Sequence, residues 1–158
     1  MPAGGGTWPA IWMLGESISE IPWPTCGEID IFEGAGNRPL VVQGTLHGPG
    51  YSADKGITTT ISQTKELSED FHTIGLLWQE NRIEWFFDDI SYFVLDTDHP
   101  QFKESDWVFN NPFYLIINLA MGGWFAGDIA PDLHSANLQV KSIHFYSIDG
   151  VGELIRHK

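Results

Sequence analysis

The sequence predicts an all-β protein whose antiparallel strands form a sandwich or a barrel. Short apolar segments recur along all 158 residues, separated by Gly, Pro, Asn and Asp. These segments are rich in β-branched and aromatic residues, which favour strands over helices. Short strands with turn signals at this spacing are typical of antiparallel sandwiches and barrels. No repeat, low-complexity tract or run of like charges divides the chain, so we predict a single domain over residues 1–158.

The chain supplies nine predicted strands. In order, they are residues 7–14, 26–33, 40–47, 57–62, 71–79, 82–87, 90–95, 113–121 and 138–146. The pairs Glu80-Asn81 and Asp88-Asp89 read as hairpin turns, because Asn and Asp tolerate the left-handed backbone that tight turns require. Only residues 100–107 look helical, and only for a turn or two.

The strand at residues 26–33 carries an unusual row of carboxylates. Side chains alternate faces along a strand, so Glu28 and Asp30 share one face while Ile29 and Ile31 point the other way. Glu33 is out of phase with Asp30. One extra residue, a β-bulge, would return Glu33 to the acidic face, and bulges are common beside active sites.

The spacing of these carboxylates suggests a reaction. Four effective steps of about 3.3 Å place the Cα atoms of Glu28 and Glu33 roughly 13 Å apart. Side chains that lean inward across a concave sheet would bring the two carboxyl groups to about 5–5.5 Å, the separation that a retaining glycosidase needs. Two other interpretations of the same residues are a solvated acidic face and a cation site.

Composition excludes several classes of partner. The net charge is −13, which argues against nucleic acid and anionic membranes, because both require basic patches. No apolar run reaches the 18 or more residues of a membrane span, and residues 1–6 show no signal peptide. Cys26 is the only cysteine. We expect it to be buried and inert, since the neighbouring Glu28 raises rather than lowers the pKa of its thiol.

Aromatic residues are the second unusual feature, with seven Trp among them. Flat aromatic faces serve as platforms for the apolar faces of sugar rings. Trp8 and Trp12 share one face of their predicted strand and are candidate platforms. Trp23, just before the acidic strand, and Trp124, in a loop after two glycines, are further candidates. Trp78 and Trp85 lie among apolar neighbours, so we predict that they belong to the core.

Two polar residues on strands complete the candidate site. His47 is placed to hydrogen-bond a sugar hydroxyl or Glu28 across the sheet, or else to close its own strand as a structural residue. Asn118 interrupts an apolar strand, and a buried amide needs partners. It would therefore brace the acids or pair with the backbone. The other histidines show no metal-ligand spacing.

Five segments, in order, resemble glycoside hydrolase family 16, and within it the laminarinase-like endo-1,3-β-glucanases. The segments are Gly-Thr-Trp-Pro-Ala-Ile-Trp-Met-Leu-Gly at 6–15, the Trp-Pro and Gly-Glu-Ile-Asp-Ile-Phe-Glu run within 23–33, Thr-Leu-His-Gly-Pro-Gly-Tyr-Ser at 45–52, the hairpin within 71–86, and Pro-Phe-Tyr-Leu-Ile-Ile-Asn-Leu-Ala-Met-Gly-Gly at 112–123. Glu33 stands three residues after Asp30, as in the bulged form of the laminarinase-like members. Members that act on mixed-linkage glucan often have a spacing of two.

The resemblance implies a concanavalin-like jelly-roll β-sandwich that lacks the family's N-terminal strands. It implies a retaining mechanism in which Glu28 is the nucleophile and Glu33 the general acid and base. Asp30 lies between them and tunes the pair. As the general acid, Glu33 needs a raised pKa, and we expect repulsion from a neighbouring carboxylate to supply that shift. It implies a β-glucan polysaccharide as substrate and an extracellular protein, which we expect to be a monomer.

The resemblance also bears on calcium. Many relatives place a calcium-ligating Asp where this chain has Lys141. An ammonium group has no lone pair for a metal, so we expect no calcium at that position and no cofactor.

Three functions remain open from the sequence. The first is a retaining endo-β-1,3-glucanase. The second is a non-catalytic carbohydrate-binding jelly roll, which would be marked by the loss of Glu28 or Glu33, and neither is lost. The third is a fragment that cannot close its sandwich, because unpaired edge strands promote aggregation.

Overall fold

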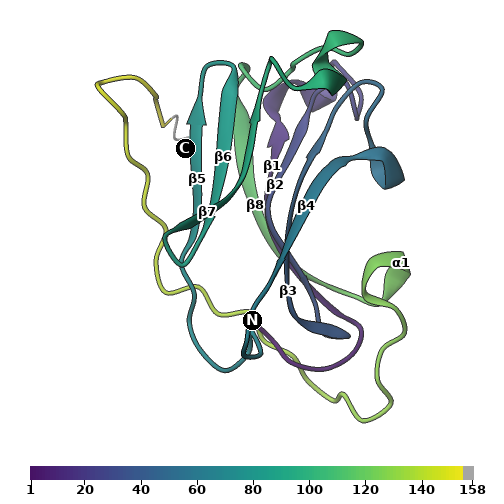
Figure 1. The fold of residues 1–158 in the computed structure, drawn as a ribbon. Helices are drawn as coiled ribbons and strands as arrows, with labels where there is room; N and C mark the ends of the chain where they lie inside the picture. The colour runs from purple at the N-terminus through teal and green to yellow at the C-terminus, as the bar shows by residue number, and fades with distance from the viewer. Residues whose placement is uncertain (155–158) are drawn as a thin grey trace.

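A computed structural model describes residues 1–154 and shows an antiparallel β-sandwich of two sheets (Figure 1). The larger sheet has the strand order β4-β3-β2-β1-β8, and the smaller has the order β5-β6-β7. In Figure 1 the five-stranded sheet curves behind and beside the smaller one. The predicted all-β sandwich is confirmed.

The five-stranded sheet carries the acidic strand near its centre. Its strands are β1 (Thr7–Gly15), β2 (Glu28–Ala35), β3 (Arg38–His47), β4 (Ile57–Ser62) and β8 (Phe113–Met121). β2 is flanked by β1 and β3, and its register shifts against both neighbours. Ile11 pairs with Phe32 while Trp12 pairs with Asp30, which leaves Ile31 as the extra residue of a bulge. The predicted bulge is confirmed.

The smaller sheet is built from two consecutive hairpins. Its strands are β5 (Ile74–Gln79), β6 (Arg82–Phe87) and β7 (Ile90–Asp96). Both predicted turns are present. Asn81 has a φ of 61°, and Asp88 and Asp89 have φ values of 47° and 63°. At Asp88-Asp89 both central residues have positive φ, as a two-residue hairpin of type I′ requires. In the Glu80-Asn81 turn only Asn81 has positive φ. β5 begins three residues later than predicted, and Phe71 lies outside it, exposed.

The core lies between the sheets and holds each acidic-strand residue that points away from the carboxylates. Ile29 and Ile31 pack there with Ile83 and Trp85 of β6. The Trp85 side chain is fully buried, and its Nε1 donates a hydrogen bond to the main-chain oxygen of Asp30 at 2.9 Å. This bond ties the smaller sheet to the bulged segment. Trp78 packs at the edge of the same core, so both tryptophans occupy the predicted environment.

The helical segments are short. They comprise α1 (Gly123–Ala126) and the 3₁₀ turns Glu16–Ser19, Ala53–Lys55 and Pro100–Lys103. The last of these lies within residues 100–107, where a turn or two of helix was predicted. α1 was not predicted. Among residues 1–154, none of the helices has the length and apolar character needed to cross a membrane.

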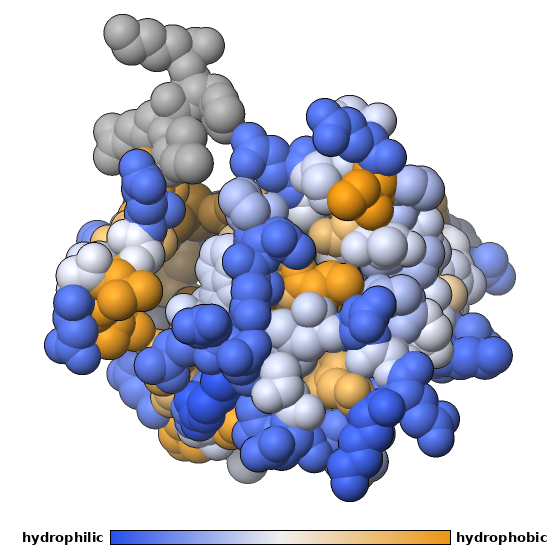
Figure 2. Space-filling view, turned by 90° about the horizontal axis from the view of Figure 1, so that it is seen from above, coloured by the Kyte–Doolittle hydropathy of each residue, from blue (hydrophilic) through white to orange (hydrophobic). Residues whose placement is uncertain are grey.

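The strand predicted at residues 138–146 is wrong. These residues form no strand, and most of their side chains are exposed. In Figure 1 the segment runs as a coil along one flank of the molecule. A strand needs a neighbour for its backbone groups, and no other strand in the described part of the chain pairs with this segment. Figure 2 shows apolar side chains reaching the surface at several places among hydrophilic ones. The exposed ones in the C-terminal segment include Val140, Ile143, Phe145, Tyr146, Ile148, Val151 and Leu154.

Candidate active site

The bulge in β2 places three carboxylates on the open face of the larger sheet. Glu28, Asp30 and Glu33 all line hollows on this face, away from the core side of the strand. On β3, His47 stands opposite Glu28, Thr45 opposite Asp30 and Gln43 opposite Glu33. The alternation of β3 therefore sets one polar side chain against each acid.

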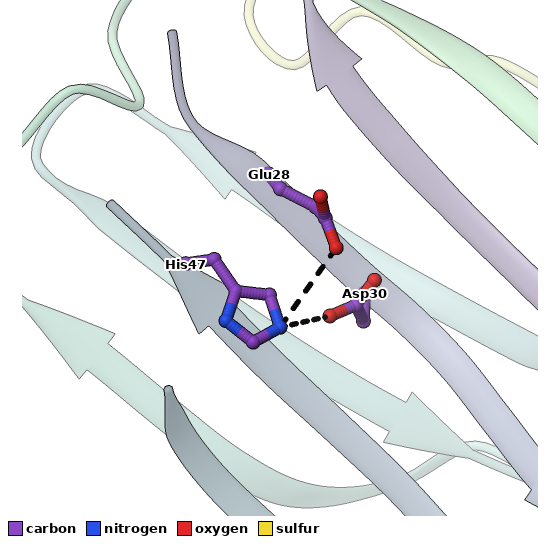
Figure 3. A group of neighbouring side chains, drawn as sticks. All are labelled: Glu28, Asp30 and His47. Carbon is purple, nitrogen blue, oxygen red and sulfur yellow. Dashed lines mark ion pairs between the residues drawn. The ribbon is translucent and has the colours of Figure 1, made fainter. Parts of the chain in front are cut away.

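Glu28 is held by partners on two sides. The Trp23 indole Nε1 donates a hydrogen bond to Oε2 at 2.8 Å, and His47 Nε2 lies 3.8 Å from Oε1. The same His47 nitrogen lies 3.1 Å from Oδ2 of Asp30. Figure 3 shows the imidazole reaching from β3 toward both carboxylates of β2.

Glu33 has a separate set of donors. The Trp8 Nε1 donates to Oε1 at 2.9 Å, and the Gln43 amide donates to Oε2 at 3.3 Å. Gln43 was not among the residues predicted for the site. The signal was present, because Gln43, Thr45 and His47 alternate along one strand and must share a face.

Burial sets the protonation of the acids. It raises the pKa of Glu28 to about 7, and repulsion from Asp30 adds to this shift. Burial also raises the pKa of Asp30, which is only 4% exposed, well above its usual value. The pKa of Glu33 is raised as well. We expected repulsion from a neighbouring carboxylate to cause that shift. Desolvation by burial causes it instead. The Trp8 indole, the Gln43 amide and the nearby Arg38 and His47 all act in the opposite direction and lower the pKa of Glu33.

Two adjoining hollows meet at the acids. One, of about 220 Å³, is lined by the acids together with Trp8, Trp12 and Asn118. The other, of about 260 Å³, lies toward β3 and is lined by Trp8, Trp23, His47 and Trp124 among others. Both include Trp8, Glu28 and Glu33, so together they form one groove across the open face. All of the predicted sugar-contacting side chains line one or both hollows.

The tryptophans differ in how they are held. Trp8 is half-buried and stacks on Phe125 of α1 with ring centroids 4.7 Å apart. Trp124 is 79% exposed and meets the edge of Trp8 at 5.8 Å. α1 therefore extends the wall of the groove. The Trp12 indole donates to Asn118 Oδ1 at 2.7 Å. Asn118 thus holds an indole, and it neither braces the acids nor pairs with the backbone as we expected.

Lys141 does not fit a calcium site. Its Nζ lies 4.0 Å from the centroid of the Phe71 ring, in a cation–π contact. Cys26 is buried and free, and burial together with Glu28 raises the pKa of its thiol. The prediction of an inert cysteine fits this environment.

Residues 1–141 match the family described as Glycosyl hydrolases family 16. This chain belongs to that family. A β-glucanase of Rhodothermus marinus is 37% identical over 154 residues, which cover 92% of this chain and 54% of that protein.

Solved structures of family members share the fold. An endo-β-1,3-glucanase from Pyrococcus furiosus is 43% identical with a TM-score of 0.80, covering 84% of this chain and 51% of that one. The laminarinase catalytic domain from Thermotoga maritima is 42% identical with a TM-score of 0.82, covering 86% of this chain and 55% of that one. The sandwich is therefore the jelly roll of this family, and the chain spans about half the length of these relatives.

Proposed function

We propose that this chain forms the catalytic face of a retaining endo-1,3-β-glucanase. One observation carries the proposal: the Ile31 bulge sets Glu28, Asp30 and Glu33 in one row on an open groove, with an indole donor on each outer acid. The two relatives with solved structures are named endo-β-1,3-glucanase and laminarinase, which supports the same reaction and linkage.

The roles of the acids follow from a double displacement. The ionised Glu28 attacks the anomeric carbon while Glu33 gives its proton to the glycosidic oxygen, so the bond breaks and the leaving sugar departs as an alcohol. Glu33 then takes a proton from water, which attacks the anomeric carbon and releases Glu28. The Trp23 indole and His47 hold the nucleophile on its two oxygens. Asp30 sits between the pair and shares their protons.

The groove suits a long, neutral and curved polymer. Trp8, Trp12, Trp23 and Trp124 offer aromatic faces along it, and sugar rings stack on such faces. A net charge of −13 opposes polyanionic substrates. A 1,3-linked glucan meets these conditions, and cleavage within the chain follows where the groove admits the polymer from both ends. Such a polymer is met outside the cell, so we propose that the protein acts there, as a monomer without a cofactor.

The catalytic roles are tested with two variants. Glu28→Gln should lose several orders of magnitude in hydrolysis while remaining folded, because no glycosyl-enzyme can form. Glu33→Ala should accumulate that intermediate on a substrate with a good leaving group. Azide should then restore turnover and yield a β-linked glycosyl azide. Near-normal turnover by Glu28→Gln, or no effect of azide, would contradict the roles.

The substrate is tested by comparing rates at equal polymer mass. We expect laminarin to be cleaved fastest and mixed-linkage β-glucan more slowly, with no cleavage of cellulose, agarose or carrageenan. A faster rate on mixed-linkage glucan or carrageenan would contradict the proposed preference for β-1,3 linkages but not the proposal that the chain is a glycosidase.

Millimolar calcium should leave the melting temperature of the protein within about a degree, since a ligand raises it only by binding the folded state. A rise of many degrees, reversed by chelator, would contradict the fit at Lys141.

A further inference from the structure

The three side chains in Figure 3 form a cluster with the composition of a metal site. Glu28, Asp30 and His47 each offer one ligand atom, and the three atoms lie within 4.8 Å of one another. Two carboxylate oxygens and an imidazole nitrogen are ligands that Zn²⁺ accepts, with bonds of about 2.0–2.2 Å.

Two of the three separations fit one shared ion directly. Two atoms that each lie about 2.1 Å from an ion can be at most about 4.2 Å apart. His47 Nε2 is 3.1 Å from Asp30 Oδ2 and 3.8 Å from Glu28 Oε1, both below that limit. The carboxylate oxygens of Glu28 and Asp30 lie within 4.8 Å of each other, so a rotation of the Glu28 side chain toward His47 closes the set.

A second observation marks this cluster off from an ordinary acidic surface. The Asp30 side chain is 5% exposed, and its buried Oδ2 accepts no well-aligned hydrogen bond from residues 1–154, with His47 Nε2 3.1 Å away. A buried carboxylate oxygen without a well-aligned donor is costly, and a cation would satisfy it. On the far side of the ring, His47 Nδ1 is also buried and has no hydrogen-bond partner within the same described residues. When the imidazole carries its proton on Nδ1, the Nε2 lone pair is available to an ion.

We propose that Glu28, Asp30 and His47 bind a Zn²⁺ ion, with the fourth position open to water. Because the ion occupies the Glu28 carboxylate, bound Zn²⁺ excludes the attack on the anomeric carbon. It therefore inhibits hydrolysis in competition with the glucan. The inhibition rests on the proposed function, whereas the binding does not. The site lacks the outer hydrogen bond that usually supports a ligating His, which commonly costs 10–100-fold in affinity. The inhibition is consequently reversible by chelators.

Binding is measured by calorimetry with ZnCl₂ on the chelator-treated chain. We expect one ion per chain. His47→Gln and Asp30→Asn should each weaken binding by at least tenfold, and circular dichroism shows whether each variant is folded. Two controls should change the affinity by less than threefold. Glu33→Gln alters an acid that belongs to the groove but not to the cluster. His72→Gln removes a histidine that has one carboxylate partner, Asp88 at 2.8 Å, and no third ligand.

Three outcomes of the ZnCl₂ titration would contradict the proposal. These are no saturable binding, equal binding by folded His47→Gln and Asp30→Asn, or equal loss in His72→Gln. CaCl₂ serves as the matched ion and should bind at least tenfold more weakly, because Ca²⁺ prefers six to eight oxygens. Laminarin hydrolysis is then assayed with Zn²⁺ and restored with a chelator. If the chain does not cleave laminarin but binds Zn²⁺ as described, the proposed function fails and the site stands.

Discussion

Glu28 and Glu33 are each stabilised in the neutral form by burial and in the charged form by particular donors. The balance is visible at Glu28, whose pKa of about 7 persists despite the Trp23 hydrogen bond and the neighbouring His47. Hydrogen-bond donors favour the ionised carboxylate, and desolvation disfavours it. Ionising an acid in the groove therefore costs free energy that ionising an exposed surface acid would not cost. Sites of this kind commonly trade stability for reactivity.

The free-energy cost of ionising Glu28 makes the stability of the folded protein depend on pH. The pKa of Glu28 is about 7 in the folded protein and 4.5 as a reference for the unfolded chain. The unfolded state therefore releases its proton first, and stability falls as the pH rises from about 4.5 through 7. Glu28→Gln removes this loss, and we expect it to stabilise the protein at pH 8 by on the order of 1–3 kcal/mol, with little gain at pH 4. Urea unfolding at both pH values measures it. An equal gain at both would show that the charge of Glu28 is not the cause.

The donor on Glu33 makes a second prediction at this scale. The Trp8 Nε1 hydrogen bond lowers the pKa of Glu33 against burial. Trp8→Phe keeps an aromatic ring beside Phe125 but removes the donor, so the pKa of Glu33 should rise. Glu33 must be protonated to act as the general acid in the first step of the reaction. The basic limb of the kcat/KM profile should therefore move to higher pH. Trp12→Phe is the matched control, because that indole donates to Asn118 and not to an acid. Trp12→Phe should leave the basic limb of the kcat/KM profile unchanged. A shift of that limb in both variants would contradict the assignment of the Trp8 indole as the donor that lowers the pKa of Glu33.

At the scale of elements, the bulge in β2 depends on the strand behind it. Its extra residue, Ile31, points into the core, while the Trp85 indole of β6 holds the main-chain oxygen of Asp30. The smaller sheet thus fixes the backbone from which the acids project. Positions of catalytic groups matter steeply, since misplacement by about 1 Å can cost 10²-fold in rate.

This coupling separates two tryptophan variants. Trp85→Phe leaves the Asp30 carbonyl without its buried donor, and we expect a loss of about 1–3 kcal/mol in stability with a fall of at least tenfold in kcat. Trp78→Phe removes a similar bond, from Nε1 to the main-chain oxygen of Phe109 at 2.8 Å, away from the acidic strand. It should cost stability but leave kcat within about threefold. Chemical unfolding and steady-state kinetics at saturating laminarin measure both. Equal effects on kcat would mean that the bond does not position the acids.

At the scale of the whole molecule, the sequence predicted the features that depend on the alternation of side chains along each strand. The acidic face and the faces of β1 follow from a period of two, and the bulge between Asp30 and Glu33 was predicted from the break in that period. Its position at Ile31 comes from the register with β1. Gln43 obeys the same alternation but was not predicted. The contact between His47 and Asp30 could not be read, because it depends on the register between strands, which alternation along one strand does not give.

The wrong prediction has a different physical origin. The segment at 138–146 has the composition of a strand, but a strand exists only beside a partner. α1 was missed for the opposite reason, because four residues are too few to show a helical period. The composition of a segment thus indicates which secondary structure the segment favours, and its neighbours in the fold decide whether that structure forms.

The exposed C-terminal segment and the net charge act against each other on the whole molecule. Ile143 and Phe145 are 62% and 50% exposed, in a segment that forms no strand, and such residues favour association through apolar contacts and strand pairing. A charge of −13 opposes association but is screened by salt, whose Debye length falls from about 30 Å at 0.01 M to about 3 Å at 1 M. The protein should therefore be monomeric at low salt and associate progressively as NaCl is added.

The double substitution Ile143→Ser with Phe145→Ser should abolish the salt-induced association, measured by light scattering, and leave the melting temperature within about two degrees, because neither side chain belongs to the core. Phe109→Ser is the contrasting variant. Its side chain is fully buried in the core between the sheets, so it should unfold the protein at lower temperature and increase association at every salt concentration. Association of the double variant equal to that of the parent chain would place the self-association surface elsewhere. A large drop in its melting temperature would show instead that residues 138–146 contribute to the fold.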